Sequence, residues 1–265
     1  MLKVQEMLSE AGCPDKPNED FIFRSDSCIA VLDGATNLIG SPYGAHEFVR
    51  DFAQRFAPLI TRVSLPQAVC DAVTQLYSDK IGGPMPSDVA LYSSAAAVFA
   101  VETETSLLFL TLGDCAALVF TDEGIIHIKN DALDKLDNTV TTRLKKLHEQ
   151  SGADVVDLLR TEEIKTMLIE NRKKMNSPGG YKSLAFNINR LTDDDVTVLD
   201  KTKVKQVVLY SDGIKSMERE MISEMPVNEM YNILRQNETA DPKLNITPRF
   251  KISDDASIVR FTIEK

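Results

Sequence analysis

The sequence predicts an α+β fold, in which antiparallel β-sheets and helices occupy separate blocks of the chain. β-Rich apolar runs separated by turn residues fill residues 92–128, whereas apolar residues recur at helical spacing in residues 44–82 and 132–175. A doubly wound parallel sheet would instead need strands and helices that alternate strictly. The 265 residues would permit two domains, but one large mixed domain is equally ordinary, and we predict one domain over residues 1–265.

The first predicted elements are a β-hairpin and two helices. Apolar runs at Phe21–Phe23 and Cys28–Leu32 flank a turn-forming segment, and the second run ends at Asp33-Gly34. From Gly44 to Ile60, apolar residues recur every three or four positions, which predicts a helix with one buried face. A second helix begins after the capping candidate Ser64 and ends at the glycines near residue 82.

The remaining elements follow the same block pattern. The runs at residues 92–128 predict an antiparallel meander, and residues 132–175 return to helical spacing. A further helix is expected over residues 216–236. The predicted strands are Ala95–Val101, Leu107–Leu112, Ala116–Phe120, Ile125–Ile128, Ser183–Ile188, Val196–Leu199, Val204–Tyr210 and Ala256–Ile263.

Composition excludes several classes of partner. The 40 acidic and 30 basic residues give a net charge of −10, which repels nucleic acid and anionic lipid. The N-terminal MLKVQEMLSE is amphipathic and acidic, unlike a signal peptide, and no run reaches the ~18 apolar residues of a membrane span. The four cysteines lie far apart without a zinc-ligand pattern. We therefore expect a cytoplasmic protein without nucleic-acid or membrane binding.

Acidic residues recur at the ends of predicted strands. Asn18-Glu19-Asp20 precedes one strand, Asp33-Gly34 and Asp212-Gly213 each follow one, and Asp254-Asp255 precedes the last. Each pair alone is typical of a turn, since Asp-Gly is among the commonest turn dipeptides. Four strand-end carboxylate groups together favour a different interpretation, because Mg²⁺ and Mn²⁺ need several oxygen ligands held on rigid elements.

The order of these motifs resembles a known family. The series NED, AVLDG, SSAAAVFAV, LTLGDCAALVF, VVLYSDG and DDASIVRF runs from residue 18 to residue 262 and resembles the type 2C metal-dependent (PPM) protein phosphatases, as a divergent, bacterial-like member. The resemblance implies a four-layer αββα sandwich, two antiparallel sheets flanked by helices. It also implies a two-metal centre at one end of the sandwich, and a variable flap beside it at about residues 131–181.

For the first metal, the resemblance implies roles for four neighbouring positions. Glu19 would bind one ion, Asp33 would bridge both ions, and the Gly34 carbonyl would be a further ligand. Asp20 would orient a water molecule for attack, so that Asp20 and Asp33 are the catalytic pair. The ions expected by resemblance are Mg²⁺ or Mn²⁺, and no nucleophilic Ser or Cys is then needed.

The second metal would be held by residues from the C-terminal half. Asp212 and Asp254 match the ligands of the other ion, and Asp114 matches an acidic residue that helps to hold a third, weaker ion. Asp255 falls where the family often has Asn or Asp, and we expect it to support the site. The substrate implied by the resemblance is phosphoserine or phosphothreonine in a protein, with a cognate kinase as a partner and a monomeric phosphatase.

Two positions depart from the family pattern. Members commonly have an arginine that holds the substrate phosphate where this chain has Asp15, so Lys16 and Arg24 become the candidates for that contact. The family's DGHGG reads Asp33-Gly34-Ala35-Thr36-Asn37 here, so the histidine proposed to protonate the leaving oxygen is missing. A site without this acid should favour aryl over alkyl phosphates.

Other functions stay open at this point. The two departures motivate a pseudophosphatase that acts as a regulatory or binding module, although every matched ligand position is acidic. Asp193-Asp194-Asp195-Val196-Thr197 superficially matches the DxDxT of aspartyl-phosphate hydrolases, but it follows no buried strand and is typical of a solvated loop. A small phosphorylated molecule as the substrate also stays open.

Overall fold

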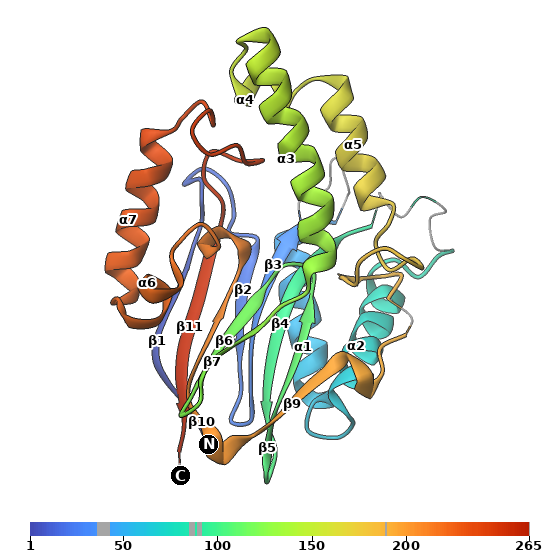
Figure 1. Cartoon of the computed structure of the whole chain (residues 1–265). Helices are drawn as coiled ribbons and strands as arrows, with labels where there is room; N and C mark the ends of the chain where they lie inside the picture. The colour runs from blue at the N-terminus through green and yellow to red at the C-terminus, as the bar shows by residue number, and fades with distance from the viewer. Residues whose placement is uncertain (36–42, 85–87, 89–91, 189, 265) are drawn as a thin grey trace.

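The computed structural model describes residues 1–35, 43–84, 88, 92–188 and 190–264. Two antiparallel sheets face each other (Figure 1). One has the order β1-β11-β10-β6-β7, and the other has the order β2-β3-β4-β5-β9 with β8 paired to β4. The strands are β1 (Leu2–Glu10), β2 (Asp20–Arg24), β3 (Cys28–Ala35), β4 (Ser94–Glu102), β5 (Ser106–Leu112), β6 (Ala116–Thr121), β7 (Gly124–Ile128), β8 (Leu184–Ala185), β9 (Val196–Asp200), β10 (Val204–Tyr210) and β11 (Ala256–Ile263).

The side chains of β3 point alternately to the two faces of its sheet, and this explains how the layers are held together. Ala30 and Leu32 pack with the helices of one outer layer, whereas Ile29 and Val31 pack against the other sheet. Successive side chains of a strand point to opposite faces, so a strand between two layers must be apolar on both. The continuous apolar run CIAVL is the sequence signature of that position.

Helices cover the outer face of each sheet. The aromatic stripe of α1 (Ala45–Leu59), including Phe48, Phe52 and Phe56, packs with α2 (Leu65–Lys80) on the β2–β5 sheet. On the other sheet, Met230 and Leu234 of α7 (Val227–Ala240) pack with residues of β6, β10 and β11, beside α6 (Arg219–Glu224). The predicted four-layer αββα sandwich is confirmed.

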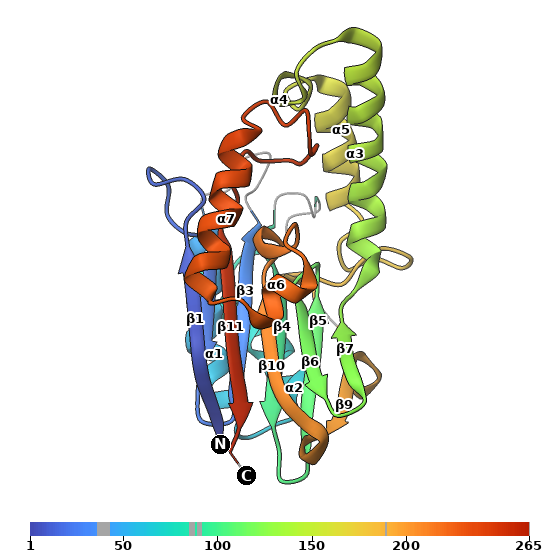
Figure 2. The same ribbon diagram turned by 60° about the vertical axis from the view of Figure 1, so that its left-hand side comes forward.

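Three further helices rise above one end of the sandwich (Figure 2). They are α3 (Asp131–Ser151), α4 (Val155–Leu158) and α5 (Glu162–Arg172). Their apolar faces form a small separate core that also takes in Leu244, from the segment after α7. These helices fall within the segment predicted as a flap, and we call them the helical insertion. No helix in the described part of the chain has the length and apolarity needed to span a membrane.

The sequence interpretation was wrong at four places. It assigned no strand to the N-terminus, but β1 pairs along its length with β11. The expected single meander is two hairpins in different sheets, because the chain crosses between the sheets after β5. The run at 183–188 contributes only the short β8, and the helix expected over 216–236 is interrupted at Pro226, which has no N–H to donate to an earlier turn.

The turn between β5 and β6 depends on a glycine. Gly113 has a φ of +70°, and a Cβ there would lie 2.6 Å from the Cβ of Ala96. Only glycine combines the left-handed backbone with this close approach. The turn lies at the same end of the sandwich as the helical insertion (Figure 1), and Asp114 lines a cavity there together with residues of α3.

Candidate active site and metal centre

Strands of both sheets end at a group of carboxylates that we call the acidic centre: Asp20, Asp33, Asp212 and Asp254. Asp20 begins β2 and lies directly opposite Asp33 of β3. Asp212 begins the short turn after β10, and Asp254 lies two residues before β11. Since the first pair belongs to one sheet and the second pair flanks strands of the other, the packing of the two sheets creates the group.

Asp20 connects the two sheets through a buried serine. Its side chain is 1% exposed, and its Oδ2 accepts a hydrogen bond of 2.8 Å from the Ser211 hydroxyl. The Ser211 Oγ in turn accepts from the Ser257 N–H at 3.0 Å. Burial raises the pKa of Asp20 to about 7, against hydrogen bonds from the two serines that lower it. The other carboxylate oxygen, Oδ1, is buried and has no partner among the described residues.

Asp33 lies among the other carboxylates of the centre. Burial raises its pKa well above the ordinary value, and the charges of Asp20, Asp212 and Asp254 raise it further. The Asp33 and Asp212 carboxyls are close enough to share a hydrogen bond. Two ionised carboxylates cannot share this space at low cost, so without a cation the pair retains a proton. A divalent cation would remove the same repulsion.

The backbone packs tightly beside Asp33. The Gly34 N–H donates to the Glu19 carbonyl at 3.1 Å, and a Cβ on Gly34 would lie 2.7 Å from that oxygen. The Glu19 and Gly12 N–H groups both donate to the Asp255 carboxylate, at 2.6 and 2.8 Å. Asp255 thus fixes the loop that carries Glu19, in agreement with the supporting role expected for it.

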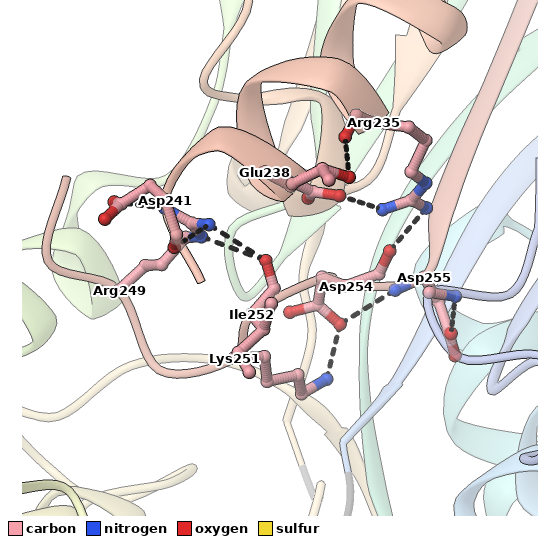
Figure 3. Close-up of polar contacts among 10 residues, drawn as sticks. Arg235, Glu238, Asp241, Arg249, Lys251, Ile252, Asp254 and Asp255 are labelled. Atoms are coloured by element: carbon pink, nitrogen blue, oxygen red, sulfur yellow. Dashed lines mark hydrogen bonds and ion pairs between the residues drawn. The ribbon is translucent and has the colours of Figure 1, made fainter. Parts of the chain in front are cut away.

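Asp254 is held from both sides (Figure 3). Its carbonyl accepts from the Arg235 guanidinium at 2.7 Å, and its carboxylate pairs with the Lys251 ammonium. Burial raises the pKa of Asp254 to about 6, and the charge of Asp212 raises it as well. Burial lowers the pKa of Lys251, but the carboxylates of Asp254, Asp33 and Asp212 outweigh it and raise the pKa above the ordinary value.

A cavity of about 380 Å³ opens on the α3 side of the centre, and we call it the α3 cavity. Asp114, Asp137, Asp212 and Lys215 are among its lining residues. Burial raises the pKa of Asp114 to about 6 and that of Asp137 to about 7, whereas the Lys215 charge lowers both. The ammonium of Lys215 is itself paired with Asp134 of α3.

Comparison with known proteins agrees with this arrangement. The family model described as protein phosphatase 2C matches residues 14–246. The chain belongs to the protein phosphatase 2C family. Membership places it among the serine/threonine protein phosphatases. No curated protein sequence matches the chain.

Solved phosphatase structures share the fold at low sequence identity. The serine/threonine phosphatase Stp1 from Staphylococcus aureus is 16% identical, with a TM-score of 0.55 over 100% of this chain and 96% of that chain. PstP/Ppp from Mycobacterium tuberculosis is 14% identical, with a TM-score of 0.54 and 100% coverage of both chains. The PstP catalytic domain in complex with two manganese ions is 15% identical, with a TM-score of 0.53 and 100% coverage of both chains.

The donor chemistry of the acidic centre fits the divalent ions of this phosphatase family. All four side chains present carboxylate oxygens, which Mg²⁺ and Mn²⁺ prefer, and one of them has a buried oxygen without a partner. Within the described ranges, however, no three Asp, Glu, His or Cys side chains converge into a ready-made metal-binding group.

The candidates for the phosphate contact lie in different places. Lys16 is exposed in the loop before β2 and lines a cavity together with Glu19 and Asp254. Arg24 is exposed at the opposite end of β2 from Asp20, so the fold does not bring it to the acidic centre. Thr36 and Asn37 of the altered DGHGG segment lie outside the described residues, while Ala35 ends β3.

The DxDxT-like segment lies in a capping turn. Asp195 accepts a hydrogen bond from the Thr192 N–H at 3.0 Å and pairs with Lys182. Its carboxylate is thus committed to local contacts, as the interpretation of a solvated loop requires.

Sequence reasoning missed several charged residues beside the acidic centre. Asp137, Lys215 and Lys251 all line the α3 cavity. A signal existed for Asp137, because Asp134 and Asp137 lie three residues apart and so share one face of α3. Lys215 and Lys251 lie three residues from Asp212 and Asp254, but that spacing alone does not show which charges meet.

Proposed function

We propose that this protein hydrolyses phosphoserine and phosphothreonine esters in proteins, with Mg²⁺ or Mn²⁺ at the acidic centre. The observation that carries the proposal is the position of Asp33, whose carboxyl lies among Asp20, Asp212 and Asp254. This all-oxygen group is assembled from both sheets of a protein phosphatase 2C fold. Such a group suits two divalent ions, and Asp114 at the α3 cavity suits a third.

The roles of the residues follow from their positions. Glu19, Asp33 and the Gly34 carbonyl would hold one ion, and Asp33, Asp212 and Asp254 the other. Bound ions would supply an activated water near neutral pH and neutralise the charge of the phosphoryl oxygens. Asp20 would orient the attacking water and accept its proton, because Ser211 fixes one of its oxygens and leaves the other without a partner.

The leaving group is expected to depart with little help from the protein. Ala35 stands where related phosphatases have a histidine, so this position supplies no acid for the departing oxygen. We therefore expect faster hydrolysis of aryl phosphates than of alkyl phosphates. Equal rates for the two esters would contradict this inference.

A second candidate function is a regulatory or binding module with little turnover. The departures at Asp15 and Ala35 favour it, whereas the retention of the carboxylates favours an enzyme. Phosphoprotein substrates follow from family membership, but a cognate kinase, a monomeric state and a cytoplasmic location stay predictions.

The test is hydrolysis of an aryl phosphate and a phosphothreonine peptide by purified protein with Mn²⁺ or Mg²⁺. A chelator and the Asp212→Ala variant serve as controls. Activity that needs metal and disappears in the variant would support the phosphatase. Metal binding without turnover would favour the regulatory module.

A further inference from the structure

A second cavity adjoins the acidic centre, on the side of the N-terminal loop. Its volume is about 790 Å³, within the range of ordinary ligand sites. It is lined by residues of two segments, 12–19 and 250–255, and by Arg160 from the connection between α4 and α5. We call it the Arg160 groove. Glu19 and Asp254 are among its lining residues, so the groove is continuous with the proposed metal centre.

Two of the three cations that line the groove form no ion pair with the described residues, although the carboxylates of Glu19, Asp254 and Asp255 line it as well. Lys16 and Arg160 are both exposed, and neither side chain has a hydrogen-bond or ionic partner among the described residues. Lys251, the third cation of the groove, is already paired with Asp254. In a chain with a net charge of −10, two unpaired cations in one groove mark a site for an anion.

Apolar residues flank these charges. Pro14, Pro17, Phe250 and Ile252 also line the groove, and the Ile252 side chain is 44% exposed. An apolar lining with a few placed charges suits an extended peptide segment that carries one strongly anionic group. A free phosphate ion would gain nothing from the apolar part.

The helical insertion holds Arg160 in this place through contacts that we call the latch. The Asn245 side chain accepts from the Val155 N–H at 3.0 Å and donates to the Asp154 carboxylate at 2.9 Å. Lys243 pairs with the same carboxylate at 3.0 Å. The latch joins α4 to the segment after α7, which continues into the wall of the groove (Figure 2).

A partly buried ion pair also orders the segment that forms this wall, residues 250–255. Arg249 binds the Asp241 carboxylate at 3.2 Å and the Ile252 carbonyl at 3.0 Å (Figure 3). Arg249 is therefore committed to the structure of this segment, unlike Arg160. Arg249 and Arg160 therefore have different roles, and of these two only Arg160 is available for a ligand.

We propose that Arg160 and Lys16 bind the phosphoryl oxygens of a phosphorylated peptide lying in the Arg160 groove. The helical insertion then supplies the guanidinium that is missing at Asp15. This inference rests on the proposed function, because it takes the acidic centre as the place of hydrolysis. Guanidinium can contact two phosphoryl oxygens at once, and the Lys16 ammonium acts as a point charge beside it.

The test measures binding separately from turnover. The probe is a fluorescent peptide carrying the non-hydrolysable phosphonate analogue of phosphothreonine, titrated with the Mn²⁺-loaded protein. We expect Arg160→Gln and Lys16→Gln each to weaken binding roughly tenfold, as the loss of a hydrogen bond to a charged group does. Arg160→Lys should restore part of the affinity, and Arg62→Gln, an exposed arginine outside the groove, should bind like the wild type.

Two controls separate the alternatives. Mn²⁺ affinity and melting temperature should not change in the Gln variants, because both side chains are exposed and unpaired. The same peptide with an unmodified threonine should bind the variants with the same affinity as the wild type. Equal losses for both peptides would overturn the assignment to the phosphoryl group, as would wild-type affinity in both variants.

The outcome is distinguishable from failure of the proposed function. Binding that depends on Arg160 without any hydrolysis would preserve this inference and contradict the phosphatase. Hydrolysis by the wild type, with an unchanged KM in Arg160→Gln and Lys16→Gln, would support the phosphatase and contradict this inference. For an active enzyme we expect KM to rise in these variants while kcat changes little, since neither residue belongs to the acidic centre.

Discussion

The two cavities beside the acidic centre differ in how their charges are balanced. In the α3 cavity, Lys215 is paired with Asp134, and the nearby carboxyls of Asp114 and Asp137 have raised pKa values. In the Arg160 groove, Lys16 and Arg160 have no partner among the described residues. The cations that line the α3 cavity are thus paired with carboxylates, whereas two cations of the Arg160 groove are not paired within the described part of the chain. The difference suggests that cations bind from the first side and the anionic substrate from the second.

The largest effect is expected from Asp33, the carboxylate proposed to contact both ions. Asp33→Asn keeps the shape of the side chain but removes a carboxyl on which the charges of four other carboxylates act: Asp20, Asp114, Asp212 and Asp254. We expect the rate of hydrolysis to fall by more than about a hundredfold. This is more than the loss of a residue that only hydrogen-bonds to a metal ligand would cause. The metal-free variant should also melt at a higher temperature than the metal-free wild type, because an amide does not have to take up a proton when the chain folds. A lower melting temperature would contradict the electrostatic account.

The next effect concerns pH and metal removal. In the metal-free protein the pKa of Asp20 is raised from 3.8 to about 7, so the folded state holds more protons than the unfolded state between these values. The contribution of Asp20 to stability therefore falls as pH rises through this range, and the raised pKa values of Asp33, Asp212 and Asp254 act in the same direction. We expect the protein in chelator to melt several degrees lower at pH 8 than at pH 5, with each 1 kcal/mol worth about 2–4 °C.

Excess Mn²⁺ should abolish or reverse this trend, because bound ions favour the ionised carboxylates. Thermal melts at both pH values, with chelator and with Mn²⁺, check the prediction. A metal-free protein that is more stable at pH 8 than at pH 5 would show that the carboxyl pKa values are not raised.

A smaller effect is expected in the α3 cavity. Burial raises the pKa of Asp137 to about 7, against the Lys215 charge, so its ionised form is destabilising near neutral pH. Asp137→Asn should raise the melting temperature, and it should do so more at pH 8 than at pH 5. If the cavity holds a third ion, the variant should also weaken the weakest Mn²⁺ binding step in a calorimetric titration, while Arg160→Gln should leave that step unchanged.

The smallest effect is expected at Arg24. The side chain is exposed at the end of β2 that lies away from the acidic centre. Arg24→Gln should therefore change kcat/KM less than twofold and stability by less than about 0.5 kcal/mol. A large rise in KM would show that this arginine, and not the Arg160 groove, contacts the phosphate.

The spacing of apolar residues predicted individual helices and strands, since this spacing depends on neighbouring residues alone. The hairpin from Phe21 to Leu32, the apolar stripe of α1 and the strand β11 were found because their periodicity matches their burial. β1 was missed, because Leu2–Glu10 has one half-exposed face at the edge of its sheet and reads equally well as an amphipathic segment. The change of sheet after β5 has no local signature.

The candidate site likewise has residues that the sequence predicted and residues that it did not. Its carboxylates were predicted, because each follows or precedes a strand and all belong to one ordered series of motifs. Arg160 was not, because only the folded structure shows that the latch joins the helical insertion to the segment after α7 and that Arg160 lines one groove with the N-terminal loop. Charges that act across such a distance in sequence become visible only when the packing is known.

The most direct test of the central claim is a calorimetric titration of the metal-free protein with Mn²⁺ near pH 7.5. The account predicts that at least two ions bind to the wild type, and that the tight steps disappear in Asp33→Asn. A wild-type protein that binds no Mn²⁺, or an Asp33→Asn variant that binds it unchanged, would show that the acidic centre is not a metal site.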